Sequence, residues 1–327
     1  PGLIRGTASA VRPAGERPAF PGPHGGGPGF RSGPRLTGGD ADTPVRHARP
    51  FCAFPVLTRP LRFLIAESEL PEQRDRRRAS VGRSSGETYA DALRAIAPDA
   101  RCDRIHPAEG EAPADGLAGY DAVFLAGSPL HLYHDTPPVR RMVAFMRAVF
   151  ESGTPAFGSC AGLQAAAAAT GGTVRGNAGS QEAGFARRIV PTDAGLAHPL
   201  LRGRPPVFDA PAIHGDEVGR LPPGATLLAG NSVTAVQAAE IRHGDGVFWG
   251  VQYHPELPLD EIAGALRRQA DDLVEQGWAA DRAAVERYAE MVDALHAEPE
   301  SHDLARHLGL DREVTALLLN PTSEPTR

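Results

Sequence analysis

Two short segments of the chain carry residue types that together could perform nucleophilic acyl transfer. Residues 157–164 read FGSCAGLQ, so Cys160 lies between two nearby glycines. Residues 250–256 read GVQYHPE, which places His254 two positions before Glu256. The three side chains would supply a thiol nucleophile, an imidazole that moves protons, and a carboxylate that orients the imidazole.

The residues around Cys160 predict a sharp turn between a strand and a helix. Residues 154–159 form the short apolar run of a buried strand. Residues 161–170 are rich in alanine, the residue with the highest helix propensity. Gly158 and Gly162 suit such a turn because neither flank of the nucleophile can carry a bulky side chain there.

This setting would activate the thiol of Cys160. At a helix N-terminus the dipole favours the thiolate over the thiol. The backbone N–H of Ala161 would point to the place where an oxyanion develops. The alternative is a buried structural cysteine, the common fate of a free thiol, but the glycine flanks favour the catalytic interpretation.

His254 and Glu256 follow residues 246–253, a run with high β-propensity. Pro255 would end that strand, and residues two apart in an extended chain share a face, so Glu256 can orient the imidazole of His254. A histidine at a strand end is more often a surface residue without a role. The cysteine turn, about ninety residues upstream, favours the catalytic interpretation.

The triad and four further segments resemble the class I glutamine amidotransferases, and most of all the glutaminase half of GMP synthase. Residues 122–129 (AVFLAGSP) resemble the strand and oxyanion loop of the family, and Gln164 matches its Cys-x-Gly-x-Gln motif. Residues 182–186 (EAGFA) and 212–218 (AIHGDEV) resemble its Glu-Phe-Gly and Ser-His-Gly-Asp segments. The segments occur in the family's order over roughly residues 61–276, and the ordered set is more specific than any one of them.

The resemblance implies a role for each matched residue. Cys160 would attack the side-chain amide of glutamine, His254 would shuttle protons, and Glu256 would orient His254. The N–H groups of Ser128 and Ala161 would form the oxyanion hole. The residues implied to hold the substrate are Gly127, Gln164, His214, Gly215 and Asp216.

Two positions depart from the family pattern. Ser128 stands where the family usually has glycine, so a loop that needs a positive φ there would be strained. Ile213 replaces a polar residue, so one hydrogen bond to the substrate would be missing or rerouted. Neither change touches the triad.

The alternation of apolar runs and helical patterns predicts an α/β fold. We expect an open, mostly parallel sheet with helices on both faces, a flavodoxin-like three-layer arrangement with the site at the carboxyl ends of its strands. Residues 71–86 are predicted to be a polar loop whose arginines, at 74–78, face solvent. Strands are predicted at 61–66, 101–105 and 122–126, and helices at 87–97, 136–150, 259–276, 280–297 and within 302–319.

Three regions are expected. Residues 1–60, rich in proline, glycine and arginine, are predicted to be disordered, as a basic arm or as an extension outside the natural protein. Residues 61–276 would form the amidotransferase domain. Residues 277–327 would form a helical extension that packs on the domain or builds a homodimer face.

Composition narrows the class of protein. The net charge of −6 gives no reason to expect nucleic acid as a partner. Three widely spaced cysteines form neither a disulfide framework nor a zinc pattern, which favours a cytoplasmic protein. No run of transmembrane length and no P-loop occurs, and the reaction needs no metal or other cofactor. The scattered His106, His131 and His134 make no convincing ligand set.

Three functions remain open at this point. The first is a glutaminase that releases glutamate and ammonia through a Cys160 thioester for an unknown acceptor, with a synthetase as its partner. The second is a free-standing γ-glutamyl hydrolase that acts on γ-glutamyl amines or peptides, since only the leaving group differs. The third is a regulatory or binding subunit without catalysis, which the complete triad disfavours.

Overall fold

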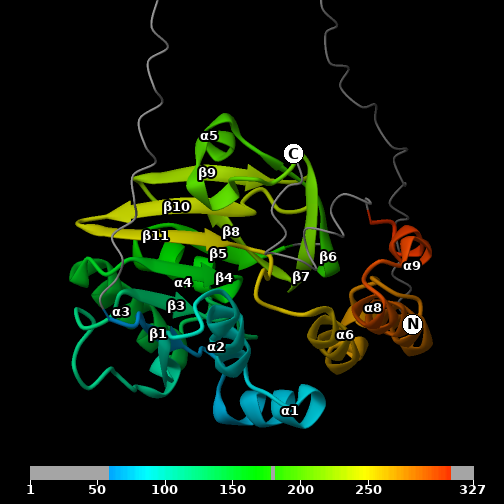
Figure 1. Ribbon diagram of the computed structural model, residues 1–327, viewed down its shortest axis with the longest axis horizontal. Coiled ribbons are helices and arrows are strands. Elements are labelled where there is room, and N and C mark those ends of the chain that lie inside the picture. The colour runs from blue at the N-terminus through cyan, green and yellow to red at the C-terminus, as the bar shows by residue number, and fades with distance from the viewer. Residues whose placement is uncertain (1–58, 178–180, 311–327) are drawn as a thin grey trace, which may run out of the picture. The chain divides into compact units, whose positions relative to one another are not determined.

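The computed structural model describes residues 59–177 and 181–310, and its central element in that part of the chain is a nine-stranded sheet (Figure 1). The strands are β1 (Arg62–Ala66), β2 (Arg101–Ile105), β3 (Ala122–Leu125), β4 (Ala156–Ser159), β5 (Thr173–Gly176), β6 (Glu182–Pro191), β7 (Phe208–His214), β8 (Asp216–Arg220), β9 (Ala225–Gly230), β10 (Ala238–His243) and β11 (Gly246–Val251). The helices are α1 (Pro71–Val81), α2 (Ser85–Ile96), α3 (Pro137–Ser152), α4 (Ala161–Ala169), α5 (Asp193–Ala197), α6 (Leu259–Arg268), α7 (Ala270–Glu275), α8 (Arg282–Ala297) and α9 (His302–His307), with 3-10 turns at Pro107–Glu109 and Pro199–Leu201.

The sheet has a parallel half and an antiparallel half. Its strand order is β2-β1-β3-β4-β11-β10-β9-β6-β7, and the pairings from β2 to β11 are parallel. The pairings from β11 to β7 are antiparallel, while β5 and β8 form a separate pair. The carboxyl ends of β1, β3, β4 and β11 therefore meet at one edge, where ligands bind in α/β sheets.

Helices cover both faces of the parallel half, which confirms the predicted α/β fold. Alternate residues of a strand point to opposite faces. Leu64 of β1 joins the cluster that contains Met146 of α3 and Leu163 of α4. Its neighbour Ile65 joins the cluster that contains Tyr89 of α2.

The predicted polar loop at residues 71–86 is wrong, because most of it forms helix α1. Pro71 stands at its first position, the backbone N–H of Leu70 donates to Gln73 Oε1 at 2.9 Å, and Gly82 ends it in the left-handed conformation. These capping signals set the helix although it lacks an apolar stripe. Its arginines do not all face solvent: Arg74 is buried and donates to the backbone of Glu69 and to Glu109.

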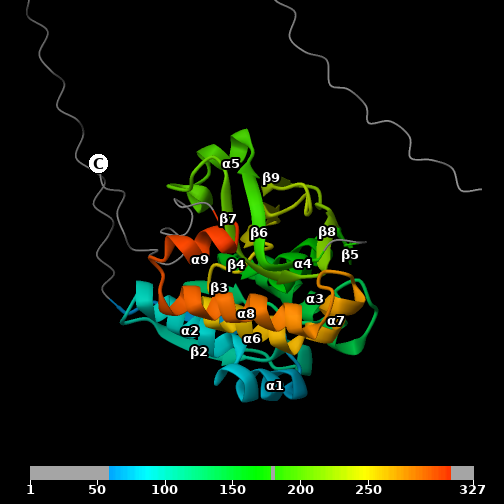
Figure 2. The ribbon, with the colours of Figure 1, turned by 90° about the vertical axis from the view of Figure 1, so that its right-hand side faces the viewer.

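The C-terminal helices pack against the domain. The single helix predicted over 259–276 is divided at Gln269 into α6 and α7. Helix α8 lies along α6 (Figure 2) and shares a hydrophobic cluster with Phe185 of β6 and Ile262 of α6. Tyr288 of α8 lies so close to Gly184 that an added methyl there would be 2.7 Å from its Cε1 atom.

Three sequence predictions lie partly or wholly outside the described residues. These are the disordered segment at 1–60, apart from its last two residues, the end of the helix expected within 302–319, and the C-terminal part of the extension at 277–327. Among the described helices, none combines the length and the apolar composition that a membrane span requires.

Candidate active site

Cys160 lies on the predicted sharp turn between β4 and α4. Its φ of 50° and ψ of −110° fall in a region that non-glycine residues rarely adopt and that occurs at strained functional turns. A methyl group at Gly162 would lie 2.7 Å from the Leu125 carbonyl oxygen, and one at Gly158 would lie 3.1 Å from Gly162 Cα. Glycine is therefore required at position 162, and Gly158 is tightly packed where strand and helix approach. The backbone N–H of Cys160 donates to the Val251 carbonyl of β11 at 2.8 Å.

His254 and Glu256 form a buried pair beside this turn. Nδ1 of His254 lies 2.7 Å from Oε1 of Glu256. Burial acts to lower the pKa of His254, but the charge of Glu256 and hydrogen bonds with Cys160 and Glu256 outweigh it and raise this pKa to about 10. The imidazole is therefore protonated at neutral pH and can act as a proton donor.

Two residues that the sequence analysis missed hold Glu256 in place. Ser159 Oγ donates to Glu256 Oε1 at 2.8 Å, and the hydroxyl of Tyr89 lies 2.7 Å from Ser159 Oγ. Burial and the charge of Glu256 raise the pKa of Tyr89 well above its ordinary value, so its hydroxyl remains a donor. The hydrogen bonds therefore connect Tyr89 to Ser159, Ser159 to Glu256, and Glu256 to His254.

We expect Ser159→Ala to lower kcat about tenfold and to leave KM nearly unchanged. The hydrogen bond that Ser159 donates positions the carboxylate behind the imidazole, and losing one such bond to a charged group costs about 1.5–3 kcal/mol. Steady-state kinetics measures both constants. Tyr89→Phe removes only the outer bond and should have the smaller effect; an unchanged kcat in Ser159→Ala would contradict the positioning role.

The loop after β3 passes directly over the triad. A methyl at Gly127 would lie 2.6 Å from His254 Cε1 and 3.5 Å from Cys160 Cβ, so only glycine fits. Ser128 does not adopt a positive φ, so the strain expected at this position is absent. Its hydroxyl instead accepts a hydrogen bond from Leu130 N–H at 3.2 Å.

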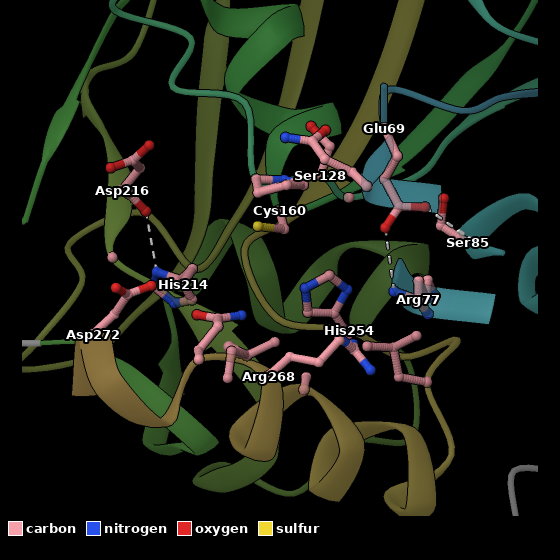
Figure 3. A pocket seen from close by; sticks show the side chains of 18 of the residues that line it. Glu69, Arg77, Ser85, Ser128, Cys160, His214, Asp216, His254, Arg268 and Asp272 are labelled. Carbon is pink, nitrogen blue, oxygen red and sulfur yellow. Dashed lines mark hydrogen bonds and ion pairs between the residues drawn. The ribbon is translucent and has the colours of Figure 1, made fainter. Parts of the chain in front are cut away.

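His214 and Asp216, two of the residues expected to hold the substrate, lie together on one side of Cys160 (Figure 3). Gln164 Nε2 donates to the Asp216 carbonyl at 3.1 Å. His214 uses both ring nitrogens inside the protein, at 3.0 Å from the Asp216 carbonyl and 3.0 Å from Glu182. The segment from His214 to Asp216 therefore offers a ligand its backbone groups and the Asp216 carboxylate. The buried Glu182 contacts His214 and holds this segment in place.

A cavity of about 710 Å³ opens above Cys160, and every predicted site residue except Ala161 lines it. Ala161 is buried beneath it at the start of α4. In the described ranges no group of three potential ligands could hold a metal ion. The sequence analysis missed the outer walls, which include Glu69, Gln73, Arg76, Arg77, Ser85, Arg268, Gln269, Asp272 and Gln276.

Residues 85–268 match the model of the family described as glutamine amidotransferase class-I. This match covers more than half of the chain, and the chain belongs to the class I glutamine amidotransferases. The resemblance drawn from the motifs is thereby confirmed.

Individual relatives differ in how much of their length the chain covers. A γ-glutamyl-L-1-hydroxyisopropylamide hydrolase of Pseudomonas sp. is 37% identical over 72% of this chain and 81% of the relative. A GMP synthase of Nitrosomonas eutropha is 37% identical over 48% of this chain but only 29% of the relative, and one of Corynebacterium diphtheriae is 34% identical over 61% and 36%. The chain thus spans about a third of these GMP synthases.

Solved structures share the fold. A glutamine amidotransferase of Thermotoga maritima superposes with a TM-score of 0.55 at 18% identity, over 79% of this chain and 98% of that one. The structure titled SMU.1228c gives a TM-score of 0.54 at 20% identity, over 72% of this chain and 97% of that one. At these identities the likeness concerns the fold alone.

Proposed function

We propose that the protein hydrolyses γ-glutamyl amides through a γ-glutamyl thioester on Cys160, with N-substituted amides as better substrates than free glutamine. The observation that carries the proposal is a cysteine on a strained turn, next to a buried His254–Glu256 pair, at the floor of a cavity of about 710 Å³. Cavities of about 300–1,000 Å³ hold ligands of drug size, so there is room for more than one amino acid.

The reaction would proceed in two halves. The thiolate of Cys160 attacks the γ-carbonyl carbon, and the oxyanion is stabilised by the N–H groups of Ser128 and Ala161. The imidazolium of His254 gives its proton to the leaving nitrogen, the C–N bond breaks, and the amine departs. Water then attacks the thioester with His254 as the base, the C–S bond breaks, and glutamate and the thiol form.

The other residues would position the substrate. Gln164 and the segment from His214 to Asp216 would hold the amino acid end of the γ-glutamyl group, as their place beside Cys160 supports. Glu256 would hold His254 with Nδ1 toward the carboxylate and Nε2 toward the reacting atoms.

Two observations favour N-substituted amides. The hydrolase from Pseudomonas, named for such an amide, matches the chain over most of both lengths. The cavity is also larger than a free amino acid requires.

A second candidate is a glutaminase that supplies ammonia to a synthetase partner. The observation that favours it is the match to GMP synthases, which covers about a third of those proteins. Glutamine hydrolysis that rises on addition of a synthetase would support this candidate.

A substrate panel tests the proposal. Purified protein is offered glutamine and γ-glutamyl amides of small primary amines, and glutamate release is measured at steady state. We expect kcat/KM for the better amides to exceed that for glutamine by about tenfold or more, the range that contacts to one additional group supply. Turnover of glutamine alone would overturn the proposal in favour of the glutaminase.

A further inference from the structure

The cavity has a second arm that the roles assigned so far leave without a ligand. Figure 3 places His214 and Asp216 on one side of Cys160, and Glu69, Arg77 and Ser85 on the other, beyond His254. Glu69 follows β1, Arg77 belongs to α1, and Ser85 is the first residue of α2. All three residues line the cavity. We call this group the β1 arm.

The position of the proton donor indicates that the leaving group of the substrate lies in the β1 arm. The proposed function has His254 protonating the departing nitrogen, so the leaving amine must lie on the His254 side of Cys160. The amino acid end occupies the opposite side, toward Gln164 and Asp216. A substituent on the amide nitrogen therefore extends into the β1 arm.

The polar groups of the β1 arm are buried and incompletely satisfied. Glu69 is 5% exposed, and Ser85 is 4% exposed. The carboxylate of Glu69 accepts one long hydrogen bond of 3.3 Å from Ser85 N–H and lies 3.7 Å from the Arg77 guanidinium. Within the described residues, Ser85 Oγ and Arg77 Nε are buried and have no hydrogen-bond partner, which is costly unless a ligand supplies one.

The charges in the β1 arm select a neutral, hydrogen-bonding substituent. An ammonium group would meet Glu69 but also the guanidinium groups of Arg76, Arg77 and Arg268, which line the same cavity. A carboxylate would be attracted by the same guanidinium groups but repelled by the buried Glu69. A hydroxyl can donate to Glu69 and accept from Ser85 or Arg77, so it satisfies both kinds of group.

The β1 arm lies at the N-terminal edge of the region that the family model matches. The family match begins at residue 85, so Glu69 and Arg77 precede it. The triad lies within the matched region.

We infer that Glu69 and Ser85 are specificity-determining residues that recognise a hydroxyl group on the leaving amine, so the preferred substrate class is the γ-glutamyl amide of a short amino alcohol. This inference rests on the proposed function and names the substrate class of the same site. The carboxylate of Glu69 accepts a hydrogen bond from the hydroxyl group of the substrate, and Ser85 Oγ donates a hydrogen bond to the same hydroxyl group.

Paired substrates test the inference. Kinetics are measured with γ-glutamyl 2-hydroxyethylamide and γ-glutamyl propylamide, which differ in a hydroxyl against a methyl, for the wild type, Glu69→Gln, Ser85→Ala and Glu72→Gln. Glu72 is an exposed carboxylate on α1 that does not line the cavity, so it is the matched control. We expect the wild type and the control to favour the hydroxylated amide by tenfold or more in kcat/KM.

The variants should lose this preference selectively. In Glu69→Gln the ratio should fall about tenfold and in Ser85→Ala about threefold, mainly through KM for the hydroxylated amide. A wild-type ratio near one, or a ratio that neither variant changes, overturns the inference while hydrolysis of both amides still supports the proposed function. Hydrolysis of glutamine with neither amide accepted overturns the proposed function as well, and the wild-type ratio decides the matter even where a variant fails to fold.

Discussion

Replacing Cys160 by alanine should abolish hydrolysis of every γ-glutamyl amide, with a loss of about 10⁴-fold or more, the scale seen when a nucleophile is removed from a triad. The remaining groups, His254 and Glu256, can orient water but cannot form the covalent intermediate. The measurement is glutamate release at steady state, together with the intact mass of acid-quenched protein. The wild type should carry a γ-glutamyl adduct during turnover, and the variant should not.

A matched control is available in the same chain. Cys102 is the other cysteine in the described residues; it lies half-buried in β2, and burial raises the pKa of its thiol, so it is a poor nucleophile. Cys102→Ala should keep full activity and the adduct. Activity that survives in Cys160→Ala would reject the thioester route, and a wild type with neither turnover nor adduct would point to the regulatory subunit.

The parts of the site that could be predicted from sequence are those set by neighbours in the chain. Gly158 and Gly162 flank Cys160 because strand and helix meet there, and the close contacts of both glycines confirm this reason. Glu256 reaches His254 because the two residues are two positions apart at a strand end. In both cases the spacing of residues along the sequence was sufficient to predict the contact.

The parts that were missed depend on contacts between distant segments. Tyr89 and Ser159 are separated by 70 positions, and only the packing of α2 on the sheet brings their hydroxyls together. The one available signal was the polar Ser159 directly before the nucleophile. Helix α1 was missed because its stability comes from capping and from buried arginine contacts rather than from an apolar stripe.

The division of the predicted closing helix has a similar origin. Gln269 interrupts it with a φ of −104° between α6 and α7. Gln269 and Asp272 lie on the cavity wall together with Arg268 at the end of α6, and α6 also packs against α8. The helical pattern over 259–276 carries no mark of the interruption, because residues on both sides are good helix formers.

Replacing Glu256 by glutamine should lower kcat/KM by about 10²–10⁴-fold and should move its alkaline limb to lower pH. The amide can no longer stabilise the imidazolium of His254 or enforce its tautomer. In the wild type the charge of Glu256 and the hydrogen bonds raise the pKa of His254 to about 10 against the effect of burial. Removing that charge lowers this pKa, so the proton donor is lost earlier as pH rises.

The pH profile of kcat/KM separates this role from a merely structural one. The wild-type profile should fall only as pH passes about 10. In Glu256→Gln the alkaline limb of the profile should lie about one pH unit or more below its wild-type position. Ser159→Ala keeps the carboxylate of Glu256 and should therefore shift this limb less. An alkaline limb that stays in place in Glu256→Gln would contradict the assignment of His254 as the proton donor.

The same pair makes stability depend on pH with a defined sign. The pKa of His254 is raised in the folded state, so its ion pair stabilises the fold fully below about 6.5 and loses that contribution as pH rises through about 10. The free energy of unfolding of the wild type should therefore exceed that of Glu256→Gln most at about pH 6, less at neutral pH and least at about pH 10. Denaturant unfolding at several pH values measures this difference, and a gap that does not narrow would show that the pair contributes packing rather than charge.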